Sequence, residues 1–361
     1  MRAYRFQSSA LPVTLVTIAA MVAAVPARAA PLDEFLSAER DYQPLGGEFE
    51  VGWDTMNEMV DFLGVRADDQ DFSGTTVGDY NGYHLRGALV LTPRLSVDGQ
   101  IATRAIDYRS DDVNSLTWHG AVQLKLTRQL SNAWPALALR LGRWGDLSED
   151  VVKTTPTTFG GVTANQVRVT GAQDIQTQLD LVASWDLGTL WSGQGRVSLL
   201  AGAGQSEVDF DEVFAKVGGA GCEYGLVSQD RNTLSGTLVN DPGGCALADF
   251  NYTVGDGSLP GPNFYLAYDA SYYQGGLNLQ WQRDLWRVRA GYRFIGLDRD
   301  IDADVLALGK TVQDTNHVFS GEVGYKFHPR VGVFLRGLIM SNQYAGDLPL
   351  AYNAFTAHRF D

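Results

Sequence analysis

After its first thirty residues the sequence lacks any uninterrupted stretch of eighteen apolar residues. A transmembrane helix needs about 20 consecutive, mostly apolar residues, so we expect no helix to span a membrane. Basic residues are also scarce, because 28 Lys and Arg stand against 42 Asp and Glu and give a net charge of −14. A strongly acidic chain repels the phosphate backbone, so the composition excludes nucleic acid as a partner.

The first residues have the organisation of a secretory signal peptide. Arg2 and Arg5 precede an apolar stretch over residues 11–25, and Ala27-Arg28-Ala29 fits an A-x-A cleavage site. We therefore predict that residues 1–29 are removed and that the mature chain begins near Ala30. No Cys follows the site, which argues against a lipoprotein. Cleavage removes three arginines and no acidic residue, so the net charge falls from −14 to −17.

From Gly47 onward, segments of about ten residues alternate apolar with polar residues, and the connectors between them alternate short with long. This double rhythm is typical of an all-β, transmembrane, antiparallel, up-and-down β-barrel with about 12 strands, because side chains of a spanning strand point alternately to lipid and lumen. The predicted strands are residues 47–56, 80–91, 95–107, 116–127, 135–144, 175–187, 196–204, 273–282, 285–297, 317–327, 331–340 and 350–360.

The predicted organisation has three parts. Residues 1–29 are the signal peptide, residues 30–46 a periplasmic lead-in, and residues 47–361 the barrel with long extracellular loops, the largest over about 205–262. With an even strand number both termini lie at the short-turn, periplasmic end. Aromatic residues gather at the strand ends as two interfacial girdles. They are Trp134, Trp185, Trp281, Trp286 and Phe327 at the short turns, and Tyr83, Trp118 and Trp144 at the long loops.

With these strands, girdles and signal peptide, the chain resembles Gram-negative outer-membrane β-barrels with a porin-like channel architecture. The resemblance covers nearly the whole mature chain, but no motif of one particular family is matched. Such barrels typically end on an aromatic residue, whereas here Phe360 is penultimate and Thr356 and His358 are poor lipid-facing residues. The resemblance implies a location in the cell outer membrane, with outer-membrane lipid and lipopolysaccharide as partners.

Strand parity places ten basic and six acidic residues inside the predicted barrel, although the chain as a whole is acidic. Rings of Arg or Lys favour anions in pores, so we predict that small solutes bind along a basic lumen. A salt-bridged network that only fills the barrel is the alternative. The basic residues are Arg86, Arg104, Lys125, Arg140, Arg196, Arg287, Arg289, Arg293, Lys326 and Arg336. The acidic residues are Glu48, Glu50, Asp54, Asp98, Asp180 and Glu322.

Signals for catalysis and metal binding are weak. His84, Arg104 and His119 face inward on adjacent predicted strands, and a hydrolase could use such a His as general base. No G-x-S-x-G motif accompanies them, and a polar lumen lining is the favoured explanation. The alternating acids Asp298 to Asp304 lack the Gly and Glu of a calcium loop and fit a solvated loop. We therefore expect neither an enzyme nor a cofactor or metal.

Only two cysteines are present, Cys222 and Cys245, both in the longest connector and both preceded by glycine. An oxidising compartment and an even count favour a single disulfide between them. A metal site would need more ligands than two cysteines and no His lies between them, and free thiols have no support either.

Two functional hypotheses follow. The first is a passive channel for small, anionic solutes, and the second is a non-conducting surface or assembly barrel that acts through its acidic, disulfide-closed loops. An outer-membrane hydrolase is a third, less favoured alternative.

Overall fold

A computed structural model gives the structure of the chain. It describes residues 35–39, 44–56, 80–108, 111–131, 133–148, 150–154, 156–159, 162–218, 221–230, 233–245, 248–253, 268–299, 315–328 and 330–340. The named elements in these ranges are all β-strands. Across the same ranges, no helix is long and apolar enough to cross a membrane.

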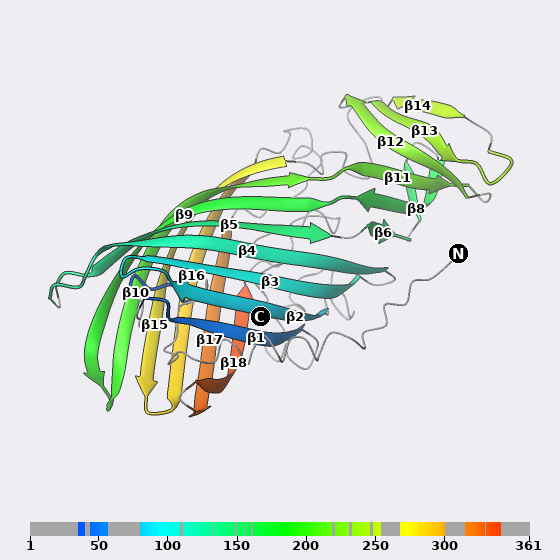
Figure 1. The fold of residues 1–361 in the computed structure, drawn as a ribbon. Helices are drawn as coiled ribbons and strands as arrows, with labels where there is room; N and C mark the ends of the chain where they lie inside the picture. The colour runs from blue at the N-terminus through cyan, green and yellow to red at the C-terminus, as the bar shows by residue number, and fades with distance from the viewer. Residues whose placement is uncertain are drawn as a thin grey trace.

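Eleven antiparallel strands form one large sheet that curls round on itself, so that its first and last strands approach one another (Figure 1). In sheet order the strands are β1 (Gly47–Met56), β2 (Tyr80–Val90), β3 (Leu95–Tyr108), β4 (Asp111–Thr127), β5 (Ala136–Ser148), β9 (Gln173–Leu190), β10 (Gly193–Asp209), β15 (Tyr268–Arg283), β16 (Trp286–Arg299), β17 (Thr315–His328) and β18 (Val331–Met340).

Each of these strands coincides with a predicted one, and β1 and β18 begin and end at the predicted residues. β4, β10 and β15 each extend five residues further than predicted at the end with the long connectors. The outward-facing residues of these extensions are polar, for example Glu207, Asp209 and Asp269. The hydrogen-bonded strands therefore continue beyond the last residues that alternate apolar with polar. The predicted twelfth strand, 350–360, lies outside the described residues.

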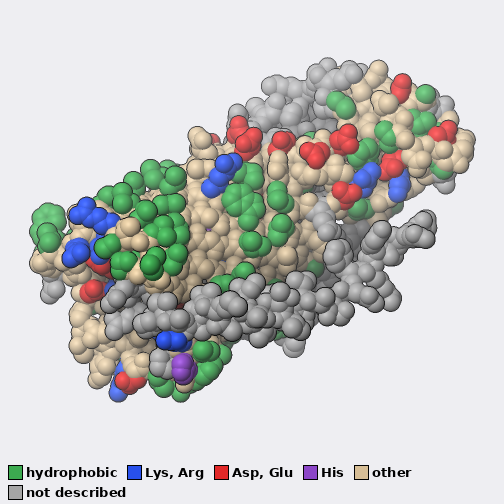
Figure 2. Space-filling view, viewed as in Figure 1, with side chains coloured by type: hydrophobic (Ala, Val, Ile, Leu, Met, Phe, Trp, Pro, Cys, Tyr) green, Lys and Arg blue, Asp and Glu red, His purple; other side chains and the backbone are tan. Residues whose placement is uncertain are grey.

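The curled sheet has inverted polarity. Its outer face carries exposed apolar side chains, which Figure 2 shows as green areas on the outside of the sheet. Leu335 is 79% exposed, Trp53 63% and Val333 60%. The inner face buries charged and polar side chains instead, with Arg140 and Arg289 each 1% exposed. Water-soluble proteins bury apolar side chains and expose charged ones, because burying a charge is costly unless it is paired.

Most of the described residues in the two longest predicted connectors, 146–174 and 205–262, form strands, which corrects the prediction that these ranges are loops. Together they supply seven strands of a second antiparallel sheet, beyond the long-connector ends of β5, β9 and β10 (Figure 1). The strands are β6 (Val151–Lys153), β7 (Thr157–Phe159), β8 (Val162–Thr170), β11 (Glu212–Val217), β12 (Cys222–Asp230), β13 (Thr233–Asn240) and β14 (Asp249–Thr253).

The second sheet has its own apolar core, which includes Val167, Val213, Tyr224 and Leu226. Its strands are short and interrupted by glycines, so the period-two pattern covers only a few residues at a time, as in Cys222, Tyr224 and Leu226 of β12. A pattern of that length does not separate a strand from a loop.

Two further predictions about the large sheet were wrong. β3 and β4 are joined by residues 109–110 alone, where a long connector was expected. Trp144, assigned to the outer girdle, instead lies on the inner face at 3% exposure, packed with Tyr272, Ile295 and neighbouring apolar residues. Its strand parity matches Arg140 rather than the outward-facing Leu141, so the position at a strand end misled the assignment.

Candidate functional site: the inner face of the curled sheet

The inner face holds a network of ion pairs centred on Glu322 of β17. Arg289 of β16 and Arg336 of β18 lie directly opposite Glu322 on the two neighbouring strands. Arg289 donates to both carboxylate oxygens, from Nε to Oε1 at 2.9 Å and from Nη2 to Oε2. Arg336 donates to Oε2 at 3.0 Å from Nε and 2.8 Å from Nη2, and Arg287 lies 3.1 Å from Oε1. Three guanidinium groups therefore share one buried carboxylate.

The network crosses from the last described strand to the first. Arg336 of β18 also donates to both oxygens of Glu50 on β1, at 3.0 Å each. Glu50 in turn contacts His84 Nε2 at 2.9 Å, and Asp54 contacts His84 Nδ1 at 2.8 Å. Charged side chains thus connect β18 to β1 and β2, although β1 and β18 are the two ends of the hydrogen-bonded order.

A second group of polar contacts lies on β3, β4 and β5. Arg140 donates to Asp98 at 2.6 Å, and its Nη2 lies 3.3 Å from His119 Nε2. On β9, Gln178 donates to Asp180, which also accepts a hydrogen bond from Gln274. Arg140 is therefore paired with a carboxylate, and Asp180 is held by two amide side chains.

All ten basic residues predicted to face inward lie on the inner face. Arg86, Arg104 and Arg293 are buried there as deeply as Arg140, Arg289 and Arg336. Lys125, Arg196, Arg287 and Lys326 are partly buried. Lys125 pairs with Glu39, Arg196 with Asp186 and Arg287 with Glu48 and Glu322. The inner face is consequently closer to a paired network than to an unbroken basic track, and its role in binding solutes stays a prediction.

Residues 35–39, which belong to the predicted lead-in 30–46, lie on the inner face, and nothing in the sequence pattern predicted this position. Phe35, Leu36, Ser37 and Ala38 are each at most 3% exposed. Leu36 and Ala38 pack against an apolar recess formed by Ala136, Ala138, Val182 and Leu200. The nearby apolar pattern is too short to signal such a burial in the sequence.

Side chains of the sheet bind the main chain of this segment. Gln123 donates to the carbonyl of Ser37 at 2.9 Å, and Asn278 donates to that of Leu36 at 3.1 Å. Ser184 Oγ accepts from the amide of Ala38 at 2.8 Å and lies 3.2 Å from Ser37 Oγ. Buried amide and carbonyl groups of the segment are therefore satisfied by the wall around it.

Both ends of the segment are also fixed by charge. Lys125 forms an ion pair with Glu39, and the Arg289 guanidinium lies over the Phe35 ring at 4.5 Å. These partners belong to β4 and β16, which are separated by β5, β9, β10 and β15. Residues 35–39 therefore bridge two strands that are five positions apart in the sheet order.

The histidines of the hydrolase hypothesis are held by other groups. Both ring nitrogens of His84 lie against carboxylates, and His119 Nε2 faces the Arg140 guanidinium. Neither arrangement presents a histidine to a nucleophile. A search of the described ranges for three or more His, Cys, Asp or Glu side chains placed to hold a metal finds none.

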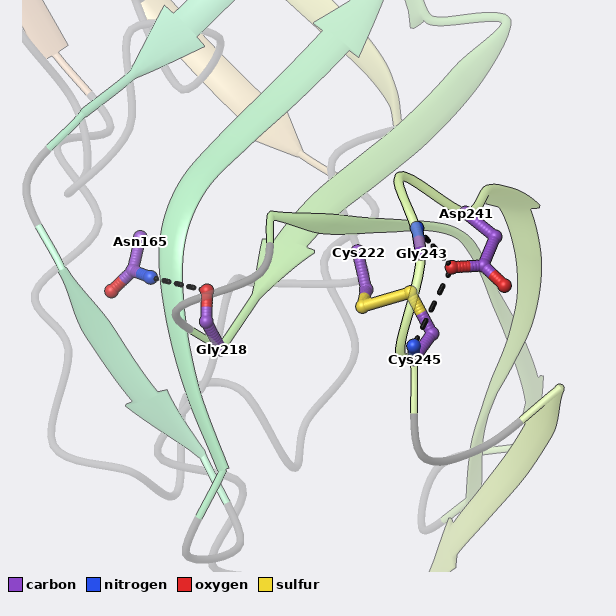
Figure 3. Close-up of a disulfide and its surroundings, with 6 residues drawn as sticks. All are labelled: Asn165, Gly218, Cys222, Asp241, Gly243 and Cys245. Carbon is purple, nitrogen blue, oxygen red and sulfur yellow. Dashed lines mark hydrogen bonds between the residues drawn. A yellow bond between two sulfur atoms is a disulfide. The ribbon is translucent and has the colours of Figure 1, made fainter.

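The predicted disulfide is confirmed. Cys222, at the start of β12, is bonded to Cys245, which follows β13 (Figure 3). Asp241 orders the intervening turn, because its Oδ1 accepts from the amides of Gly243 at 2.8 Å and Cys245 at 3.4 Å. Gly243 has a φ of 108°, which suits glycine. The bond therefore fastens the end of β13 to the core of the second sheet.

An ion-pair cluster lies on the other face of the second sheet. Arg168 donates to Asp150 at 3.1 Å and to Glu223 at 3.2 Å, and it lies over the Phe214 ring at 4.3 Å. Partial burial opposes the charged form of Arg168, but the two carboxylates outweigh it and raise its pKa.

Comparison with known proteins adds little. No family model matches the chain, and no curated protein matches it. Among solved structures, the siderophore receptor PirA from Pseudomonas aeruginosa is similar at 10% identity and a TM-score of 0.21. That alignment covers 84% of this chain and 66% of the receptor, just under two thirds of its length. A likeness of this size carries no argument about fold or function.

Proposed function

We propose that this chain is a transmembrane β-barrel of a Gram-negative outer membrane, exported by a signal peptide that is cleaved near Ala30. The observation that supports the proposal most strongly is the inverted polarity of the curled sheet. Its outer face is a broad apolar surface, while its inner face buries ion pairs. Lipid accommodates such an outer face, whereas water would drive it to aggregate.

The proposed barrel closes through a twelfth strand at 350–360, between β18 and β1. β1 and β18 are the first and eleventh strands of an antiparallel sheet, so they run in the same direction. One strand antiparallel to both completes an even-numbered barrel and removes both free edges. Residues 341–361 supply 21 residues, enough for a turn and a spanning strand of roughly 9–11 residues.

The proposed activity is passive conduction of small solutes through a narrow lumen with a weak preference for anions. Strand parity places ten Lys and Arg against six acids inside, and with Asp146 and Asp174 of β5 and β9 added the remaining small excess of basic residues favours anions. The preference is weak because Glu322, Glu50 and Asp98 neutralise the nearest guanidinium groups. Outer-membrane lipid and lipopolysaccharide are the proposed surroundings, and no enzymatic activity or cofactor is part of the proposal.

Conductance of the purified, folded protein in planar bilayers tests this activity. Glu322→Gln removes one negative charge among three guanidinium groups. The reversal potential measured in a salt gradient should therefore move toward the value expected for an anion-selective channel. Glu207→Gln is the matched control, because Glu207 is exposed on the outer face. An unchanged reversal potential would refute the role of the arginines, and a protein that never conducts would refute the channel.

A non-conducting surface barrel is the second candidate, and the second sheet favours it. That sheet has its own apolar core and a disulfide, so it is an ordered module rather than a set of loops. Acidic side chains lie along the top of the view from the curled sheet to this module (Figure 2). This candidate is favoured if the whole protein binds lipopolysaccharide or cell-surface material and produces no current steps in planar bilayers.

A further inference from the structure

We propose that residues 35–39 are a resident plug, bound in a peptide site on the inner face, and that solutes pass only when this plug leaves its site. The inference rests on the proposed channel function and adds its regulation. The segment belongs to the chain itself, so its local concentration at the site is fixed by the short connection to β1, which begins at Gly47.

The wall is built to match the segment. The inner face is mostly charged or amide-bearing, yet at Ala136, Ala138, Val182 and Leu200 it forms an apolar recess across three adjacent strands. Leu36 and Ala38 fill this recess. Small side chains at both Ala136 and Ala138, each 0% exposed, leave the space that the segment occupies. An apolar recess facing a water-filled lumen would otherwise be unfavourable.

The polar groups of the wall match the segment as well. Gln123 and Asn278 each donate to one main-chain carbonyl, while Ser184 accepts from one main-chain amide. Such contacts recognise the main chain of a peptide. Lys125 selects the acidic side chain of Glu39 and Arg289 the aromatic ring of Phe35. The site therefore recognises a short peptide with an aromatic residue first and an acidic residue last.

The position of the plug explains how it would block conduction. Its partners come from β4, β5, β9, β10, β15 and β16, so it lies across the concavity rather than along one wall. The remaining inner surface near Arg289 is filled by the ion pairs of Glu322. Arg289 contacts both the plug and Glu322, so the plug adjoins the ion-pair network, and residues 35–39 do not belong to either hydrogen-bonded sheet.

A reversible cysteine lock tests the plug. Ser37 Oγ and Ser184 Oγ are 3.2 Å apart, so Ser37→Cys with Ser184→Cys should form a disulfide under oxidation, detectable by mass spectrometry. The fraction of open channels in the locked protein should be at most about a tenth of that in the reduced form. The reason is that a disulfide favours the bound plug over the released plug by more than a factor of ten. Wild type with and without the same reductant is the control, because reduction also opens Cys222–Cys245.

A release variant provides the opposite test. Leu36→Ala empties part of the recess and should raise the open fraction at least about tenfold, since truncating a buried Leu weakens its packing by more than that factor. Leu45→Ala is the matched control, because Leu45 is 71% exposed and should leave conduction unchanged.

The outcomes separate the plug from the channel. Failure of the two cysteines to bond shows that the segment lies elsewhere and overturns the plug. If the bond forms but locked, reduced and Leu36→Ala proteins conduct equally, the plug is refuted and the channel stands. If the bond forms and every folded variant is silent, the channel is refuted, and with it the gate, while the position of the segment is established.

Discussion

Removing the Glu322 carboxylate should destabilise the curled sheet strongly. Glu322 is 2% exposed and pairs with Arg287, Arg289 and Arg336. In Glu322→Ala, Arg336 keeps Glu50, and Arg287 keeps Glu48 at 3.6 Å. Arg289 has no other ion pair among the described residues, so one deeply buried guanidinium loses its counter-charge.

The magnitude follows from that single uncompensated charge. Breaking a buried ion pair by removing one partner costs about 3–5 kcal/mol, and we expect a loss in this range for Glu322→Ala. Urea unfolding of the folded protein in detergent micelles measures it, and the heat-modified gel shift should occur at a lower temperature. Glu207→Ala, at an exposed outer position, should show no loss.

A second substitution separates lost charge compensation from general damage. Arg289→Met in the Glu322→Ala background removes the unpaired guanidinium and should recover about half of the lost stability or more. If Glu322→Ala costs less than about 1 kcal/mol, or if Arg289→Met worsens it, the charge argument is incorrect.

Three further predictions concern the ends of the sheet and the second sheet. A double-mutant cycle with Glu50→Gln and Arg336→Gln should give a coupling of about 1–3 kcal/mol, and additivity would show that this contact does not join β18 to β1. Cys222→Ser with Cys245→Ser should make the second sheet protease-sensitive, because losing the disulfide lowers the stability of that sheet by about 3 kcal/mol in the loop-closure model. The barrel should stay folded, and loss of membrane insertion would contradict this prediction. Thr92→Cys should react only from the periplasm and Val239→Cys only from outside intact cells, and reversed labelling would overturn the topology.

Period-two alternation predicted the large sheet well because the two faces of that sheet differ in polarity along most of each strand. In the proposed barrel, lipid on one side and a polar interior on the other impose this pattern on each strand, and Gly47–Met56 and Val331–Met340 were placed to the residue. Outside the apolar band of the proposed barrel both faces meet polar surroundings. The extensions of β4, β10 and β15 therefore lack apolar outward residues, and the short strands of the second sheet carry the pattern over only a few residues each.

Parity likewise assigned the inward-facing arginines correctly to one face, but it contains no information about what lies against that face. Whether Arg289 lines an open path depends on Glu322, which faces it from the next strand, and on Phe35, which is more than 250 residues away in sequence. The first partner follows from register once strand ends are known, because residues directly opposite each other meet. The second does not, since residues 35–39 have no periodicity of their own and are placed by a recess formed from three distant strands. An interior that the sequence describes as a basic lumen is therefore, once its occupants are included, a paired network around a bound segment of the same chain.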